Sequence, residues 1–289
     1  MNPTKNDWIN LPKYLDEFAQ ITHEFIQTIE QRAVASNKQS IASSDLSKSG
    51  NSFDEVTKQL RENLIPYLSA SRGPRYWGFV TGGATPIATF ADWLVSTFDQ
   101  NVSKGGDSIS TTIERQTLTW LCKLFYLPSS FKGSLTTSAT AANFLATIRA
   151  RQYIGQKQVT YVANIKDSEK IDCGELEKHL TKSTSKGKMV IASAATVTAT
   201  DFDDLVKIKA LCNKHNAWLH VDAAFGIFER LINGSQGKTN GIELADSITL
   251  DCHKWLNVPY ECGVFLTQHR QQLFESWMCQ PLIPISLNM

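Results

Sequence analysis

Apolar residues recur every three or four positions in the first part of the chain. This spacing predicts helices that each bury one face. One such helix is expected over residues 11–32 and another over about 56–68, joined by a serine-rich linker at 36–52. The stripe of the first helix packs either on its own core or on a second subunit. Its members are Leu11, Leu15, Phe18, Thr22, Phe25 and Ile29.

From residue 86 onward, helical patterns alternate with short apolar runs typical of buried strands. Helices are predicted over 87–98, 109–126 and 202–215, and strands over 159–163, 188–195, 217–222, 246–250 and 262–267. This alternation favours an α/β fold with a mainly parallel, doubly wound sheet. In such a sheet the ligand site lies beyond the carboxyl ends of the strands.

Composition narrows the class of protein and its compartment. The 289 residues are 42% hydrophobic and carry a net charge of +1, so the chain has enough apolar mass for a core and no strongly basic surface for nucleic acid. The six cysteines are dispersed, the first residues lack a signal-peptide pattern, and no run is long enough to span a bilayer. We therefore expect a cytoplasmic protein without nucleic acid or membrane as a partner.

Three segments could carry chemistry, although each also has an ordinary structural explanation. Asp222 leaves the strand 217–222 at its carboxyl end, where it either meets a ligand or caps a turn. Lys254 follows the strand 246–250 and is either a desolvated nucleophile or a lysine that extends to water. The hydroxyl-rich residues 136–143 run into a helix and are either a phosphate cradle or an N-cap.

Taken together, the three segments match the needs of pyridoxal phosphate: a phosphate cradle, a carboxylate for the pyridine nitrogen and a lysine for the aldehyde. The chain resembles the group II pyridoxal-phosphate amino acid decarboxylases, which include the aromatic amino acid, histidine and glutamate decarboxylases. The resemblance rests mainly on HVDAAFG at 220–226 and ADSITLDCHKW at 245–255. TTSATAAN at 136–143, TTIERQTLTWL at 111–121 and SAATVTATDFDDL at 193–205 support it.

The resemblance implies the aspartate-aminotransferase-like fold, known as PLP fold type I, and an obligate dimer. Residues 1–85 would be an N-terminal helical segment and linker, and residues 86–289 an incomplete PLP-binding large domain. It also implies no metal site, because Cys212 and His215, which with His220 could suggest one, fall at a helix end in the family.

The roles that the resemblance implies fall on a small set of residues. Lys254 would hold the cofactor as a Schiff base and move a proton, and Asp222 would keep the ring nitrogen protonated. The remaining cofactor contacts would come from Ala224 against the ring, Ala139 and Thr140 at the phosphate, and His253 near the phosphate or the substrate carboxylate, with Thr196 and Asp251 as further candidates.

Two departures from the family affect function. The chain passes from residues 161–163 directly to a stretch that resembles a later part of the family, so the histidine that stacks on the cofactor ring is missing with its segment. The chain also stops at Met289 without a small C-terminal domain, which fits a natural short form, a decayed gene or part of a longer chain.

These features leave three hypotheses for function. The first is a carboxy-lyase acting on a small L-amino acid, and the second is a family member that binds cofactor without turnover. The third is another reaction of the fold, such as aldol cleavage or transamination. For the 289-residue chain we expect a dimer or larger assembly that tends to aggregate and has low or no decarboxylase activity.

Overall fold

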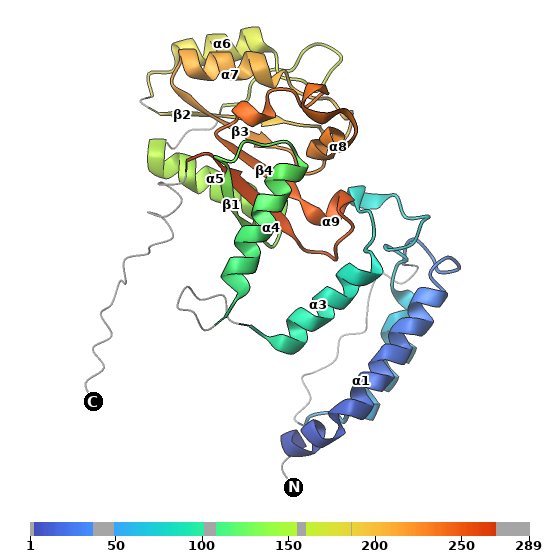
Figure 1. Ribbon diagram of the computed structural model, residues 1–289. Helices are drawn as coiled ribbons and strands as arrows, with labels where there is room; N and C mark the ends of the chain where they lie inside the picture. Colours follow the sequence, from blue (N-terminus) through green and yellow to red (C-terminus); the bar gives the residue numbers. More distant parts are fainter. Residues whose placement is uncertain (1–2, 37–48, 101–107, 155–159, 186, 270–289) are drawn as a thin grey trace, which may run out of the picture. The chain divides into compact units, whose positions relative to one another are not determined.

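The chain forms two compact units, Met1–Gly83 and Ala84–Met289 (Figure 1). The computed structural model describes residues 3–36, 49–100, 108–154, 160–185 and 187–269. The predicted linker at 36–52 lies mostly outside the described residues. In the described part, no helix is both long and apolar enough to cross a membrane.

The first unit is helical, as the spacing predicted, but its first helix has different bounds. Helix α1 spans Pro3–Gln27 rather than 11–32. Beyond Gln27 the chain continues as a turn, in which the Thr28 hydroxyl donates to the carbonyl oxygens of Glu24 and Phe25. Helix α2, Phe53–Gln59, begins at a Ser52 capping box and continues into short π and 3₁₀ turns that end at Tyr67.

The two helices of this unit are held together by an aromatic stack and an ion-pair cluster. The rings of Tyr14 and Phe53 stack with centroids 3.7 Å apart. Arg61 binds Glu17 at 3.0 Å and Glu24 at 2.5 Å. Since these side chains are about one-third to one-half exposed, the ion pairs orient the helices more than they stabilise them.

The second unit is built on a five-stranded sheet in the order β1-β5-β4-β3-β2. The strands are β1 Lys132–Thr136, β2 Lys188–Ser193, β3 Ala217–Asp222, β4 Ser247–Asp251 and β5 Gly263–Thr267. Strands β2, β3 and β4 are parallel, and β5 is antiparallel to both of its neighbours, so β1 runs in the same direction as β2–β4. The mainly parallel α/β fold is confirmed, with one reversed strand.

One predicted strand does not form, and one strand of the sheet was not predicted. The predicted strand at 159–163 does not form, since described residues 160–163 are irregular and only an isolated bridge joins Asn164 to Ile171. Strand β1 was not predicted, because its sequence KGSLT offers little β-propensity and is defined by pairing with β5. Strand β5 runs antiparallel because residues 252–262 are too few for a parallel crossover.

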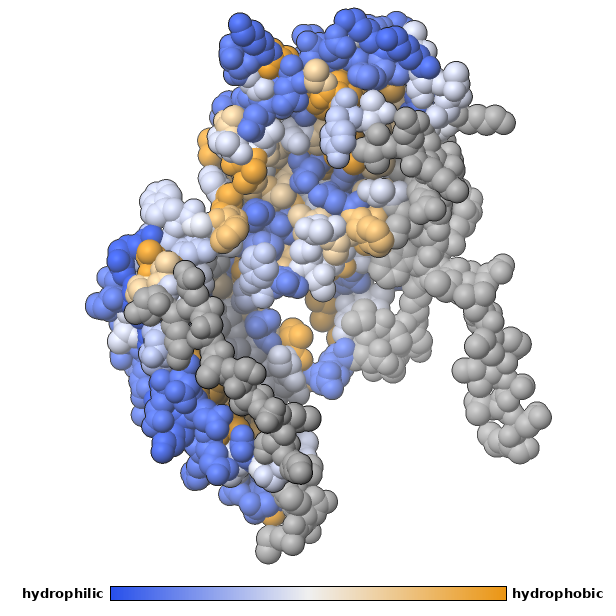
Figure 2. Space-filling model, turned by 180° about the vertical axis from the view of Figure 1, so that it is seen from behind, coloured by the Kyte–Doolittle hydropathy of each residue, from blue (hydrophilic) through white to orange (hydrophobic). Residues whose placement is uncertain are grey.

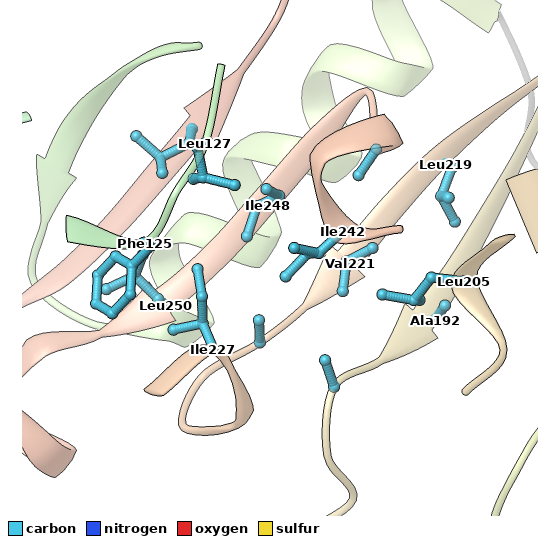
Figure 3. Packing of buried hydrophobic residues seen from close by; sticks show 14 of the residues in the cluster. Phe125, Leu127, Ala192, Leu205, Leu219, Val221, Ile227, Ile242, Ile248 and Leu250 are labelled. Carbon is cyan, nitrogen blue, oxygen red and sulfur yellow. The ribbon is translucent and has the colours of Figure 1, made fainter. Parts of the chain in front are cut away.

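One face of the sheet packs into the main hydrophobic core (Figure 3). Helices α4 Ser110–Leu124, α6 Cys173–Lys182 and α7 Leu205–Lys214 contribute to this core. Alternate strand residues point into it, and Val221, Ile248 and Leu250 are fully buried. Burying each such side chain contributes about 1.5–3 kcal/mol, which fixes the strand ends firmly.

The other face of the sheet meets helix α5, Ala139–Ile154, and is largely polar in its centre. Because side chains alternate along a strand, the residues between the core positions face α5. On β3 and β4 these are Trp218, His220, Asp222, Ser247, Thr249 and Asp251. Five of them, namely Trp218, His220, Ser247, Thr249 and Asp251, are buried, and this row leads to the carboxyl ends of the two strands.

Candidate functional site

The carboxyl ends of β3 and β4 bring together most of the predicted site residues. Asp222 ends β3, Asp251 ends β4, and Ala139 begins α5. The backbone N–H of Ala139 donates to Oδ1 of Asp251 at 2.5 Å, and the backbone N–H of Asp251 donates to the carbonyl oxygen of Ala224 at 3.0 Å. The start of α5 and both strand ends are therefore tied into one cluster.

The Asp222 carboxylate is half-buried and held by two donors. Its Oδ1 accepts from the backbone N–H of Ala224 at 3.1 Å, and its Oδ2 accepts from Nδ2 of Asn143 at 2.7 Å. A carboxylate can accept about four hydrogen bonds, so two donors orient Asp222 without exhausting its capacity.

Asp251 and His253 form a buried pair beside Asp222. Their Oδ2 and Nε2 atoms are 3.6 Å apart, and both side chains are more than nine-tenths buried. Burial raises the pKa of Asp251 above its usual range, against the lowering effects of His253, the Ala139 N–H and Lys254, and the Asp222 charge raises it further. Burial also lowers the pKa of His253. Burial thus disfavours charge on both groups and favours a neutral pair.

Lys254 lies in a single helical turn, α9 Cys252–Trp255, that follows β4 directly. This turn is anchored because the backbone N–H of Cys252 donates to the carbonyl oxygen of Cys262 at 2.8 Å. Lys254 is half-buried, and its charge acts on Asp251. The structure therefore places an amine and two carboxylates in one electrostatic neighbourhood.

The predicted phosphate contacts have mixed surroundings. Ala139 is buried with its N–H bound to Asp251, whereas Thr140 is exposed in the first turn of α5. Thr196 lies in the turn after β2, where its Oγ1 accepts from the backbone N–H of Asp201 at 3.1 Å. A phosphate at the start of α5 would have to share the Ala139 N–H with Asp251 or displace Asp251 from it. The phosphate-binding roles of these residues stay predictions.

Two glycines allow the loops of this site to approach each other closely. A Cβ atom at Gly226 would lie against the backbone of Ala194 and Ala195, so the turn after β3 passes next to the end of β2. A Cβ atom at Gly263 would overlap the backbone of Ser138, directly before α5. Both contacts need glycine, and both keep the site compact.

The three residues with the metal-ligand pattern lie on different sides of the sheet. Cys212 packs in the main hydrophobic core, where burial raises its pKa to about 12. His220 lies on the opposite face beside Asn143, and His215 ends α7. In the described part of the chain, no group of three potential ligand residues is placed to hold a metal ion.

Sequence reasoning missed Asn143 and Ser247, which connect the site to the polar face of the sheet. Asn143 stood inside the hydroxyl-rich motif without a role of its own. Alternation could have found Ser247, since AWLHVD and SITLD place polar residues at every second position of strands that are otherwise apolar. Asn143 lies in helix α5, where no such pattern marks it.

A model of the pyridoxal-dependent decarboxylase conserved domain matches residues 36–168 and 158–282. The chain belongs to the pyridoxal-dependent decarboxylase family. The family match falls into two parts that overlap at 158–168, next to the place where the sequence predicts a missing segment. The predicted resemblance is confirmed, and pyridoxal phosphate is the cofactor of this family.

Curated relatives agree with this assignment. The chain is 27% identical over 267 residues to an aromatic-L-amino-acid decarboxylase of Bacillus atrophaeus, covering 81% of this chain and 55% of that one. It is 30% identical over 218 residues to an L-2,4-diaminobutyrate decarboxylase of Rhizobium meliloti, covering 63% and 43%. The chain thus spans about half the length of the curated relatives it matches.

Solved structures share the fold. A tryptophan decarboxylase of Catharanthus roseus matches with a TM-score of 0.82 at 16% identity, over 92% of this chain and 68% of that chain. The Oryza sativa enzyme TDC, solved with PLP and tryptamine, gives a TM-score of 0.85 at 17% identity, over 97% and 67%. The predicted PLP fold type I is confirmed.

The residues present fit the cofactor on three observations. The Asp222 carboxylate is oriented with unused acceptor capacity, and Lys254 is half-buried with its charge acting on Asp251. Nδ1 of His253 is buried and has no hydrogen-bond partner among the described residues. A polar nitrogen in that state costs free energy unless a ligand satisfies it. The site therefore offers an anion, an amine and an unsatisfied nitrogen to a polar ligand.

Proposed function

We propose that this chain is the cofactor-binding part of a pyridoxal-phosphate-dependent carboxy-lyase that acts on a small L-amino acid. The observation that carries the proposal is the clustering of Asp222, Lys254 and the start of α5 at the carboxyl ends of adjacent strands. When bound, the cofactor supplies an electron sink for the pair of electrons left behind by departing CO2.

The residues of the chain would each have a defined part. Lys254 would attach the cofactor through its amine and later move a proton at Nζ, while Asp222 would hold a proton on the ring nitrogen by its charge. Ala224 would pack on the ring. Thr140, Ala139, His253 and Thr196 would contribute to binding at and around the phosphate.

A second candidate is a family member that binds the cofactor without turnover. The division of the family match into two parts at 158–168 supports it, because the segment with the ring-stacking histidine is expected there.

The test is release of labelled CO2 from a panel of carboxyl-labelled L-amino acids that includes aromatic ones and 2,4-diaminobutyrate. CO2 release with matching amine formation supports the lyase. Cofactor binding without CO2 supports the second candidate, and ketone or aldehyde products indicate another reaction of the fold.

We propose further that the chain forms a homodimer in the cytoplasm. Helix α3, Pro86–Phe98, supports the dimer because its apolar side chains are exposed, with none of its residues buried. Its exposed apolar residues are Ile87, Phe90, Trp93, Leu94, Val95 and Phe98. Figure 2 shows that apolar residues also reach the surface among polar ones on the face it displays. A bare stripe of this size is unusual on a monomer.

The dimer is tested by charge substitution on α3. We expect Leu94→Glu to shift the chain from dimer to monomer in sedimentation velocity, because it places a charge in the apolar stripe. Ser96→Glu, on the other side of the same helix, should leave the dimer intact. A wild-type chain that sediments as a stable monomer, or a dimer unaffected by Leu94→Glu, would refute this assignment of α3.

A further inference from the structure

We propose that Asn143 is a positioning residue for the cofactor: it couples the buried His220 to Asp222 and fixes the orientation in which the Asp222 carboxylate meets the ring nitrogen. The inference rests on the proposed function and extends it to two side chains, those of Asn143 and His220, that do not themselves meet the substrate.

The observation is a continuous chain of hydrogen bonds beneath Asp222. Nε1 of Trp218 donates to Oγ of Ser247 at 2.8 Å, and Oγ of Ser247 lies 2.8 Å from Nδ1 of His220. Nε2 of His220 lies 2.9 Å from Oδ1 of Asn143, and Nδ2 of Asn143 donates to Oδ2 of Asp222 at 2.7 Å. These residues come from β3, β4 and α5, so the chain spans the whole polar layer.

The chemistry of the end groups fixes the direction of every bond. An ionised Asp222 carboxylate only accepts, so the amide NH₂ of Asn143 must face it and the amide oxygen must face His220. That oxygen also only accepts, so Nε2 of His220 carries the proton and Nδ1 of the neutral ring accepts from the Ser247 hydroxyl. The Ser247 oxygen then accepts from the Trp218 indole. One arrangement satisfies all five groups.

His220 is suited to this task because it stays neutral. It is fully buried, and burial lowers its pKa to about 4. A neutral imidazole holds the Asn143 side chain in one orientation by a hydrogen bond, and it places no positive charge close to Asp222. The Asp222 charge therefore remains available for the ligand, whereas a cation in direct contact would compete for it.

The alternative is that the network only satisfies buried polar groups in the fold. The two explanations differ in what a break would change. A purely structural network affects the unfolding of the apoprotein alone. A positioning network also affects cofactor affinity, and it does so even when the fold is intact.

The experiment uses the full chain and two breaks in the network. Asn143→Leu keeps a similar side-chain volume but removes the hydrogen bonds to Asp222 and His220. Ser247→Ala, at the far end of the network, removes the hydroxyl that accepts from the Trp218 indole and donates to His220. Thr147→Ala is the control, since it changes an exposed hydroxyl one turn further along α5 that donates to the Asn143 carbonyl oxygen and to no other described residue. The readouts are the dissociation constant for pyridoxal phosphate, the absorption spectrum of the bound cofactor, and the apoprotein Tm.

We expect Asn143→Leu to weaken cofactor binding at least tenfold and to shift the absorption band. Ser247→Ala should act in the same direction with a smaller effect, and it tests the network even if Asn143→Leu fails to fold. Affinity and spectrum equal to wild type in a folded Asn143→Leu or Ser247→Ala variant, with only Tm lowered, would overturn the positioning role. Failure of the wild type to bind the cofactor would instead refute the proposed function.

Discussion

Replacing Lys254 by alanine is expected to abolish covalent attachment of pyridoxal phosphate completely. Lys254 is half-buried in a turn that follows β4 and is tied to Cys262 just before β5, and its charge acts on the Asp251 carboxylate. A lysine amine is the nucleophile that forms a Schiff base with the aldehyde of the cofactor. None of the other residues proposed for the site has an amine that could form a Schiff base with the cofactor. The expected loss is therefore total rather than partial.

The measurement is borohydride reduction of the cofactor-loaded chain followed by peptide mass spectrometry. Wild type should carry the reduced pyridoxyl group on the peptide that contains Lys254, and Lys254→Ala should carry none. Lys188→Ala is the matched control, because Lys188 is also half-buried but lies at the opposite end of β2, bound to the His215 carbonyl oxygen. A pyridoxyl group on another lysine in wild type would show that Lys254 has been misassigned.

The sequence predicted the parts of the site that follow from strand ends. Asp222 and Lys254 could be placed because each follows a run of buried apolar residues, and parallel strands bring their carboxyl ends to one edge. The strand runs themselves are readable because Val221, Ile248 and Leu250 point into one apolar core. The local pattern of apolar residues was sufficient to predict the strands whose side chains are buried in the core.

The rest depended on contacts between distant segments. Nothing local in KGSLT predicts β1, which exists through its pairing with β5. The direction of β5 follows from the short connection between β4 and β5. The hydrophobic pattern within a strand does not reveal its direction. Asn143 contacts His220 only because α5 packs on β3, and the two residues are 77 positions apart in the sequence. The hydrogen-bond network was therefore invisible to periodicity alone.

Asp222→Asn is expected to reduce any decarboxylation by the chain roughly 10²- to 10³-fold, the loss typical when one electrostatic contact to a developing charge is removed. The substitution keeps the size of the side chain and an acceptor for the Ala224 or Asn143 donor, but it removes the anion that would hold a proton on the ring nitrogen. Without that proton the ring withdraws electrons less strongly from the bond that breaks. Cofactor retention should weaken as well.

Asp246→Asn separates this charge effect from general loss of a buried carboxylate. Asp246 directly precedes β4, at the other end of the strand, and pairs with Lys209 at 2.8 Å with both side chains largely buried. Removing its charge breaks that pair, so the apoprotein Tm should fall while the turnover per bound cofactor stays near wild type. Asp222→Asn should show the reverse, with Tm nearly unchanged and turnover lost. If both variants lose only Tm, Asp222 is a cap for the turn after β3 rather than a partner of the cofactor.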